Sequence, residues 1–65
     1  MLPHQQRVID EKTDLDDRRA RLAAFIGTDT HCGLPEAERA RLRLQLGVMA
    51  LYSEILEDRI AAFPP

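Results

Sequence analysis

The segment from Pro35 to Phe63 carries apolar side chains on more sides of a helix than one neighbouring helix can cover. One row at helical spacing consists of Leu42, Gln45, Met49, Tyr52, Leu56, Arg59 and Phe63. A second row beside it consists of Leu44, Val48, Leu51, Ile55 and Ala62. A helix that must bury more than one stripe needs more than one neighbour. Since the rest of the chain offers a single further helix, the pattern predicts self-association.

The length of the chain leads to the same prediction. Its 65 residues make one domain, and a domain of that size is marginally stable unless disulfides, a metal or oligomerisation supplement its core. Cys32 is the single cysteine, and His4, His31 and Cys32 do not have the spacing of a metal site. We therefore expect no intrachain disulfide, no metal and no cofactor, which leaves oligomerisation.

The order of the elements predicts an all-α, two-helix antiparallel hairpin. Helix one is expected at about 4–26, the connector at 27–34 and helix two at about 35–63. Pro3 and Pro35 suit first helical turns, and Gly27 suits a left-handed stop. The inward stripe of helix one is predicted to contain Val8, Leu15 and Leu22, supported by Ile9, Phe25 and Ile26. Two such hairpins placed back to back would make a four-helix bundle.

Three residues of helix two allow two interpretations each. Gln45 and Arg59 either fix the register and number of partners or lie at the edge of the apolar row and reach water. Gly47 is either tolerated in mid-helix at a cost of about 1 kcal/mol or marks a close crossing of two helices.

Charge is distributed unevenly along the chain. Residues 18–43 contain six arginines against three acidic residues, whereas the flanking residues 1–17 and 44–65 are both net negative. In a hairpin the connector end is therefore basic, and the first amides of helix two lie there as well. This end could hold a phosphate through Arg18, Arg21, Arg39, Arg41 and Arg43, with Tyr52 or His31 stacking on a base.

A solvated face is the alternative for the same arginines. Arg18, Arg21, Arg39 and Arg41 each follow an acidic residue by three or four positions, a spacing typical of exposed ion pairs. His31 and Cys32 are correspondingly expected to be unreactive loop residues.

Composition excludes several classes of function. A net charge of −2 disfavours binding to long nucleic acids. No acid–base pair, activated nucleophile or metal cluster can be placed on one surface, so an enzyme is not expected. With no apolar run that spans a bilayer and no signal-like start, we expect no membrane partner and a cytoplasmic location in the host cell.

Two stretches of the chain carry a resemblance, namely Leu34-Pro35-x-x-Glu38-x-x-x-Leu42-x-x-Gln45-x-x-x-Met49-x-x-Tyr52-x-x-x-Leu56-x-x-Arg59-Ile60 and the leading Gln6-Arg7-Val8-x-Asp10-Glu11-Lys12-x-x-Leu15-Asp16. On these residues the chain resembles small helical-hairpin proteins encoded in the accessory regions of tailed phages and prophages. Some small phage hairpins are counter-defence sponges, which form homo-oligomers and trap nucleotide signals between subunits without chemistry. The resemblance implies an oligomeric phage accessory protein and transfers no binding residues.

Three hypotheses of function follow. The first is a non-enzymatic sponge that sequesters a nucleotide-like anion between its own copies. The second is an adaptor or inhibitor that binds a host protein through an apolar groove. The third is a purely structural oligomerisation module.

Overall fold

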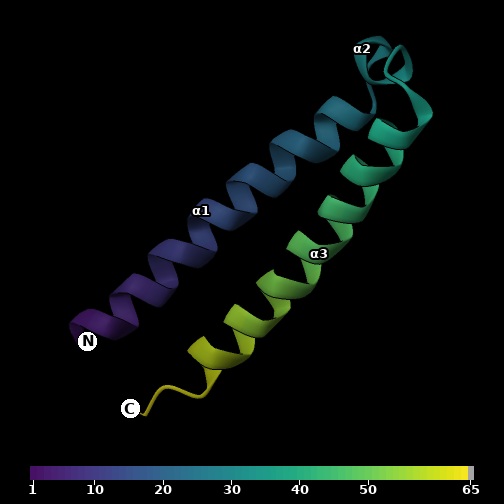
Figure 1. The fold of residues 1–65 in the computed structure, drawn as a ribbon. Coiled ribbons are helices and arrows are strands. Elements are labelled where there is room, and N and C mark those ends of the chain that lie inside the picture. The colour runs from purple at the N-terminus through teal and green to yellow at the C-terminus, as the bar shows by residue number, and fades with distance from the viewer. Residues whose placement is uncertain (65) are drawn as a thin grey trace.

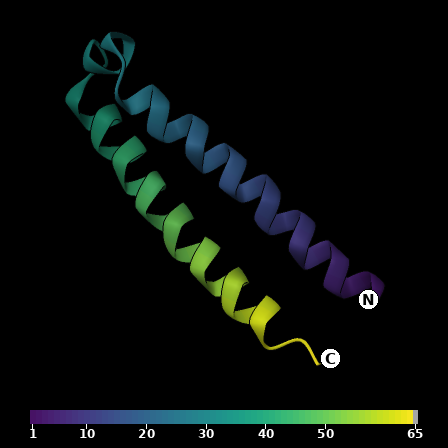
Figure 2. The same ribbon diagram turned by 180° about the vertical axis from the view of Figure 1, so that it is seen from behind.

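Two long helices lie side by side and run in opposite directions along a rod of 48 × 14 × 13 Å (Figures 1 and 2). The computed structural model describes residues 1–64. Helix α1 spans Pro3–Ile26, the single-turn helix α2 spans Asp29–Cys32, and α3 spans Glu36–Ala61. These residues contain no strand, which confirms the expected all-α class. Both chain ends lie at one end of the rod, and α2 lies at the other (Figure 1).

Local hydrogen bonds explain where α1 begins. Pro3 occupies the first helical position, as predicted, where its missing N–H is not needed. The Leu2 amide donates to Oε1 of Gln5 at 2.9 Å, so a glutamine in the first turn satisfies the amide just before the helix.

The connector differs from the prediction because it contains α2. The hydroxyl of Thr28 accepts a hydrogen bond from the His31 amide at 3.3 Å and donates one to the Phe25 carbonyl at 2.6 Å. These two bonds join the end of α1 to one further helical turn. Gly27 has a φ of −82°, so the predicted left-handed stop is wrong. Within the segment predicted as a connector, the Thr28 side chain caps a helix.

The bounds of α3 are shorter than predicted at both ends. Pro35 has an extended backbone, with a ψ of 146°, and is the residue before the helix rather than part of its first turn. Glu36 and Glu38 lie in that first turn, where they complement the positive end of the helix dipole. The helix ends at Ala61 rather than Phe63, because Pro64 disfavours helical geometry at the residue before it.

The contact between α1 and α3 is called the seam below. Along α3 and just beyond its end it follows Leu42, Leu46, Met49, Ser53, Leu56, Ile60 and Phe63, none of which is exposed. On α1 it follows Gln5, Val8, Lys12, Leu15, Arg19, Leu22 and Ile26. Both lines advance by three and four residues in turn, as in a coiled coil. Within residues 1–64, Val8 and Leu56 are the only buried large apolar side chains, and Leu56 alone is fully buried, so the core of a single copy is small.

Candidate functional site

An uncovered apolar stripe on α3 is the first candidate for a binding surface. We call Leu44, Val48, Leu51 and Ile55 the outer stripe, and their side chains are 70%, 60%, 59% and 50% exposed. At about 100° per residue, the centre of this stripe lies roughly 150° around α3 from the seam. The second row predicted from sequence is therefore the row that α1 leaves bare.

The first predicted row is only half correct. Leu42, Met49, Leu56 and Phe63 lie toward α1, but Gln45, Tyr52 and Arg59 are exposed. Leu46, Ser53 and Ile60, each one residue further along, occupy the seam in their place. Gln45 and Arg59 thus match the interpretation in which they lie at an edge and reach water.

A polar cluster within the seam joins the two helices. Ser53 on α3 donates to Oδ1 of Asp16 on α1 at 2.5 Å, and Nζ of Lys12 lies 3.4 Å from the Ser53 hydroxyl. The same Nζ lies 2.6 Å from Oδ2 of Asp16 and 3.3 Å from Oε2 of Glu57. Each helix thus supplies two of the four groups, which we call the seam cluster.

The charges of the seam cluster shift the titration of two groups. The hydrogen bond to Asp16 raises the pKa of Lys12, and Glu57 adds to that shift. Hydrogen bonds from Lys12 and then Ser53 lower the pKa of Asp16. Both charged forms are therefore favoured in the folded chain. Sequence analysis missed this cluster. The signal that could have found it is the spacing of Gln5, Lys12 and Arg19, which follow one another at intervals of seven residues and therefore share one side of α1.

The five predicted anion-binding arginines do not converge within one copy. Residues two apart on a helix point to different sides, so Arg41 lies roughly 200° around α3 from Arg39 at about 100° per residue. Arg39 and Arg43 are four residues apart and share a side of α3. On α1, Arg18 and Arg21 are exposed beside each other.

Three of these arginines already have ion-pair partners. Exposed ion pairs join Arg18 to Asp14 at 3.3 Å, Arg21 to Asp17 at 3.2 Å and Arg41 to Glu38 at 3.0 Å. Such pairs are worth little individually, and they match the solvated-face interpretation. Arg39 and Arg43 have no ion-pair partner within residues 1–64.

His31 and Arg39 have buried nitrogens that lack a hydrogen-bond partner. His31 is 4% exposed, and its ring meets that of Phe25 edge-on, with centroids 5.9 Å apart. Neither Nε2 of His31 nor Nε of Arg39 has a partner within the described chain. His31 is thus a buried helical residue rather than the loop residue that was expected, while the thiol of Cys32 beside it is exposed. A buried polar atom left unpaired costs about 1–3 kcal/mol, so a hydrogen-bond partner for either nitrogen would stabilise the fold.

Tyr52 lies far from these groups along the chain. It is 40% exposed and stands more than four turns into α3, between the seam and the outer stripe. The structure therefore does not bring Tyr52 to the connector end within one copy.

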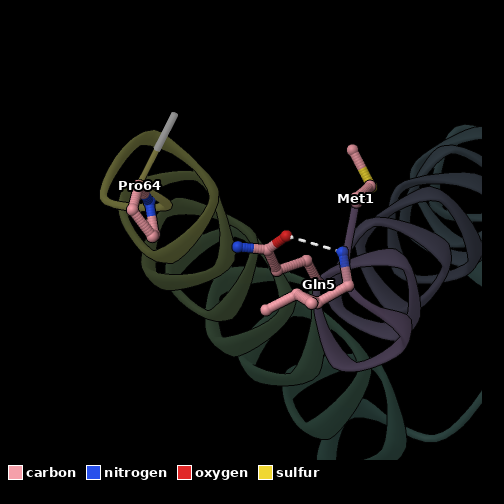
Figure 3. A pocket seen from close by; sticks show the side chains of 4 residues that line it. Met1, Gln5 and Pro64 are labelled. Carbon is pink, nitrogen blue, oxygen red and sulfur yellow. Dashed lines mark hydrogen bonds between the residues drawn. The ribbon is translucent and has the colours of Figure 1, made fainter.

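A shallow pocket lies at the opposite end of the rod, beside the chain ends. Its volume is about 390 Å³, and Met1, Leu2, Gln5 and Pro64 line it (Figure 3). The amide nitrogen of Gln5 faces the side on which Pro64 lies, while its oxygen accepts from Leu2 (Figure 3).

Membrane-spanning helices and metal sites are two further features to consider in residues 1–64. No helix in this range is long and apolar enough to cross a membrane. No group of three or more His, Cys, Asp or Glu side chains is arranged to hold a metal ion there.

Comparison with known proteins gives one match. The model of a family described as Sequestin matches residues 2–62, which include both long helices and the connector between them. Neither the curated proteins nor the solved structures yielded a match.

Proposed function

This chain belongs to the Sequestin family, and we propose from that membership that it is a non-enzymatic protein that binds and sequesters another molecule. The family name denotes sequestration, and the fold carries binding surfaces in a chain of one small domain. The bound molecule in this proposal is a nucleotide-like anion held between copies of the chain. The resemblance to phage hairpin proteins supports a role as a phage counter-defence protein acting in the host cell.

The observation that carries the anion proposal is the pair of unpartnered buried nitrogens at the connector end. His31 and Arg39 lie in the part of the chain that is net positive. Phosphate oxygens are strong acceptors for guanidinium N–H groups. Arg43 lies one turn after Arg39 and has no ion-pair partner in residues 1–64, so it completes a small basic surface on one side of α3.

Separation of the arginines within one copy explains why the proposed pocket lies between copies. Arg39 and Arg41 point to different sides of α3, and one small ligand does not reach both from a single chain. A second copy would bring further side chains, Tyr52 of that copy among them, toward the same ligand. Arg18, Arg21, Arg41 and Tyr52 are therefore contributors only in an assembly.

Calorimetry with a panel of cyclic dinucleotides and ADP-ribose-type nucleotides tests this proposal. We expect heat of binding and a rise in Tm that shrinks as salt is added. Arg39→Ala and Arg43→Ala should each reduce the affinity. Arg7→Ala is the matched control, because Arg7 is an exposed arginine on α1 at the acidic end of the rod. A panel with neither heat nor a change in Tm would contradict the proposal.

The outer stripe favours a second candidate function. Exposed apolar side chains at helical spacing are a common docking surface for proteins, so an adaptor or inhibitor of a host protein remains the alternative. A specific partner that binds independently of nucleotides, and is lost when Leu51 becomes Glu, would support it. A structural oligomerisation module is the third possibility, and it predicts self-association without any other partner.

A further inference from the structure

The outer stripe is an extended apolar surface that the fold leaves without a covering element. Five of the seven exposed large apolar side chains lie on α3, namely Leu44, Val48, Leu51, Tyr52 and Ile55. The side of α1 that faces away from α3 is charged by contrast, with Asp10, Asp14, Asp17 and Arg21 all exposed. Apart from Met1 and Leu2 at the start of the chain, the exposed large apolar side chains of the rod therefore lie on one helix.

The seam alone is a weak source of stability. It buries only two apolar side chains, Val8 and Leu56, and also accommodates Gln5, Lys12, Arg19 and Ser53. A contiguous row of exposed apolar side chains marks a candidate interaction site. A helix with apolar stripes on opposite sides is expected to have a neighbour on both.

The charge distribution indicates which neighbour fits and in which direction. Residues 18–43 are net positive, while residues 1–17 and 44–65 are net negative. Two copies placed antiparallel bring the basic connector end of one beside the acidic end of the other. Two copies placed parallel bring like charges together at both ends of the rod. A second copy of this chain thus complements itself only in the antiparallel direction.

We propose that two copies pack through the outer stripes of their α3 helices, antiparallel to one another. Leu44 then lies beside the partner's Ile55, and Val48 beside the partner's Leu51. The midpoint of the stripe falls near the middle of α3, so the two helices overlap along most of their length. The proposal specifies the self-association step of the proposed function, and it does not depend on any ligand.

The flanking residues follow from the same pairing. Arg43 comes level with the partner's Glu54 and the partner's Asp58 on one flank of the stripe. Arg41 comes level with the partner's Arg59, and its charge is already paired with Glu38 at 3.0 Å. The small residue Ala37 meets the partner's Ala62 at each end of the contact.

Disulfide crosslinking tests the direction. In a Cys32→Ser background, Ala37→Cys and Ala62→Cys each place one thiol on the line of the outer stripe, and both alanines are exposed. In the antiparallel pair, residue 37 of one copy meets residue 62 of the other, whereas the two residues at 37 are about 38 Å apart at 1.5 Å per residue. A disulfide needs Cα atoms within about 7 Å.

The antiparallel pairing therefore predicts a mixed disulfide between the two variants under mild oxidation, and no disulfide in Ala37→Cys alone. Mass spectrometry identifies each species. A disulfide between two copies of Ala37→Cys would overturn the antiparallel direction. The absence of every disulfide, together with sedimentation as a single copy at high concentration, would overturn the pairing altogether.

A charged substitution tests the surface itself. Leu51→Glu should convert the sedimenting species from two or more copies to one, whereas Ala24→Glu on the exposed side of α1 should not. If Leu51→Glu also lost its helical circular dichroism, the crosslinking result in the folded cysteine variants would still decide the proposal. Nucleotide binding is measured separately: a crosslinked antiparallel pair that binds no nucleotide would contradict the proposed function and leave this inference standing. Nucleotide binding by a single sedimenting copy would overturn this inference and the placement of the ligand between copies, while sequestration of a nucleotide would stand.

Discussion

The hydroxyl of Ser53 donates a hydrogen bond of 2.5 Å to the carboxylate of Asp16 across the contact between α1 and α3. The two residues are 37 positions apart in the chain, and Lys12 lies within reach of both. Ser53 is 5% exposed. A buried serine thus connects the two helices at a position where a coiled coil ordinarily has an apolar side chain.

Replacing Ser53 by alanine tests that connection. We expect Ser53→Ala to lower the free energy of unfolding by about 1 kcal/mol, because a buried hydrogen bond is lost. Chemical denaturation at a fixed protein concentration measures the change. Thr13→Ala is the control, since the Thr13 hydroxyl bonds only the Ile9 carbonyl on its own helix and is exposed. Equal effects of the two substitutions would contradict a special role for the bond across the helices.

The pH dependence of stability should reflect Asp16 and Lys12. The pKa of Asp16 is lowered from its usual 3.8, so its contribution is present above that value and is lost as the pH falls through the folded pKa. The pKa of Lys12 is raised from its usual 10.5, so its contribution is present below that value and is lost as the pH rises through the folded pKa. Stability should therefore be flat between these limits and fall beyond both.

Thermal unfolding of the wild type and of Lys12→Met from acid to alkaline pH measures this profile. Lys12→Met should remove the alkaline fall that Lys12 contributes and weaken the acid fall, because Asp16 loses its largest source of stabilisation. A variant whose profile matched that of the wild type at both limits would show that the seam cluster does not control the pH response.

Leu56 and Ile55 are neighbours in the chain with opposite exposure. Leu56 is 0% exposed in the seam, whereas Ile55 is 50% exposed on the outer stripe. We expect Leu56→Ala to cost about 2–5 kcal/mol of folding free energy, as buried leucines do. Ile55→Ala should cost little in a dilute sample and should weaken self-association, which sedimentation over a range of concentrations reports. A large, concentration-independent loss in Ile55→Ala would place Ile55 in the core of a single copy.

Gly47 is a site at which substitution should stabilise α3. A Cβ placed there meets no atom within 4 Å, so the single chain has room for alanine. We expect Gly47→Ala to raise the stability by up to about 1 kcal/mol through helix propensity. A rise in Tm at low concentration, measured by circular dichroism, would support this expectation. Weaker self-association in the same variant would indicate that another backbone passes close to Gly47.

The helices and their start signals were largely predictable from sequence because proline and apolar spacing act locally. Pro3 begins α1, and Leu44, Val48, Leu51 and Ile55 share one side of α3 as expected. The extra turn α2 was not predicted, since the same threonine and aspartate side chains that form turns also cap helices. Two hydrogen bonds of the Thr28 hydroxyl join this turn to the end of α1.

The line of contact between the helices was harder to predict. Apolar spacing favoured Gln45 and Tyr52 for the inward positions, whereas the chain uses Leu46 and Ser53. A polar serine beside α1 is favoured only because Asp16 and Lys12 face it from the other helix, and such pairing across the fold cannot be derived from periodicity. Likewise, sequence proximity grouped Arg39 with Arg41, although helical geometry turns them to different sides.

The use of both sides of α3 has a consequence for how this chain can change over evolution. Substitutions on the outward side of α1 change exposed, charged positions and should have little effect on packing. On α3, only the two narrow flanks between the seam and the outer stripe offer such positions. If the outer stripe is occupied as proposed, most drift should be tolerated on the outward side of α1, and new ligand specificities should arise at the connector end or along the flanks that carry Tyr52 and Arg43.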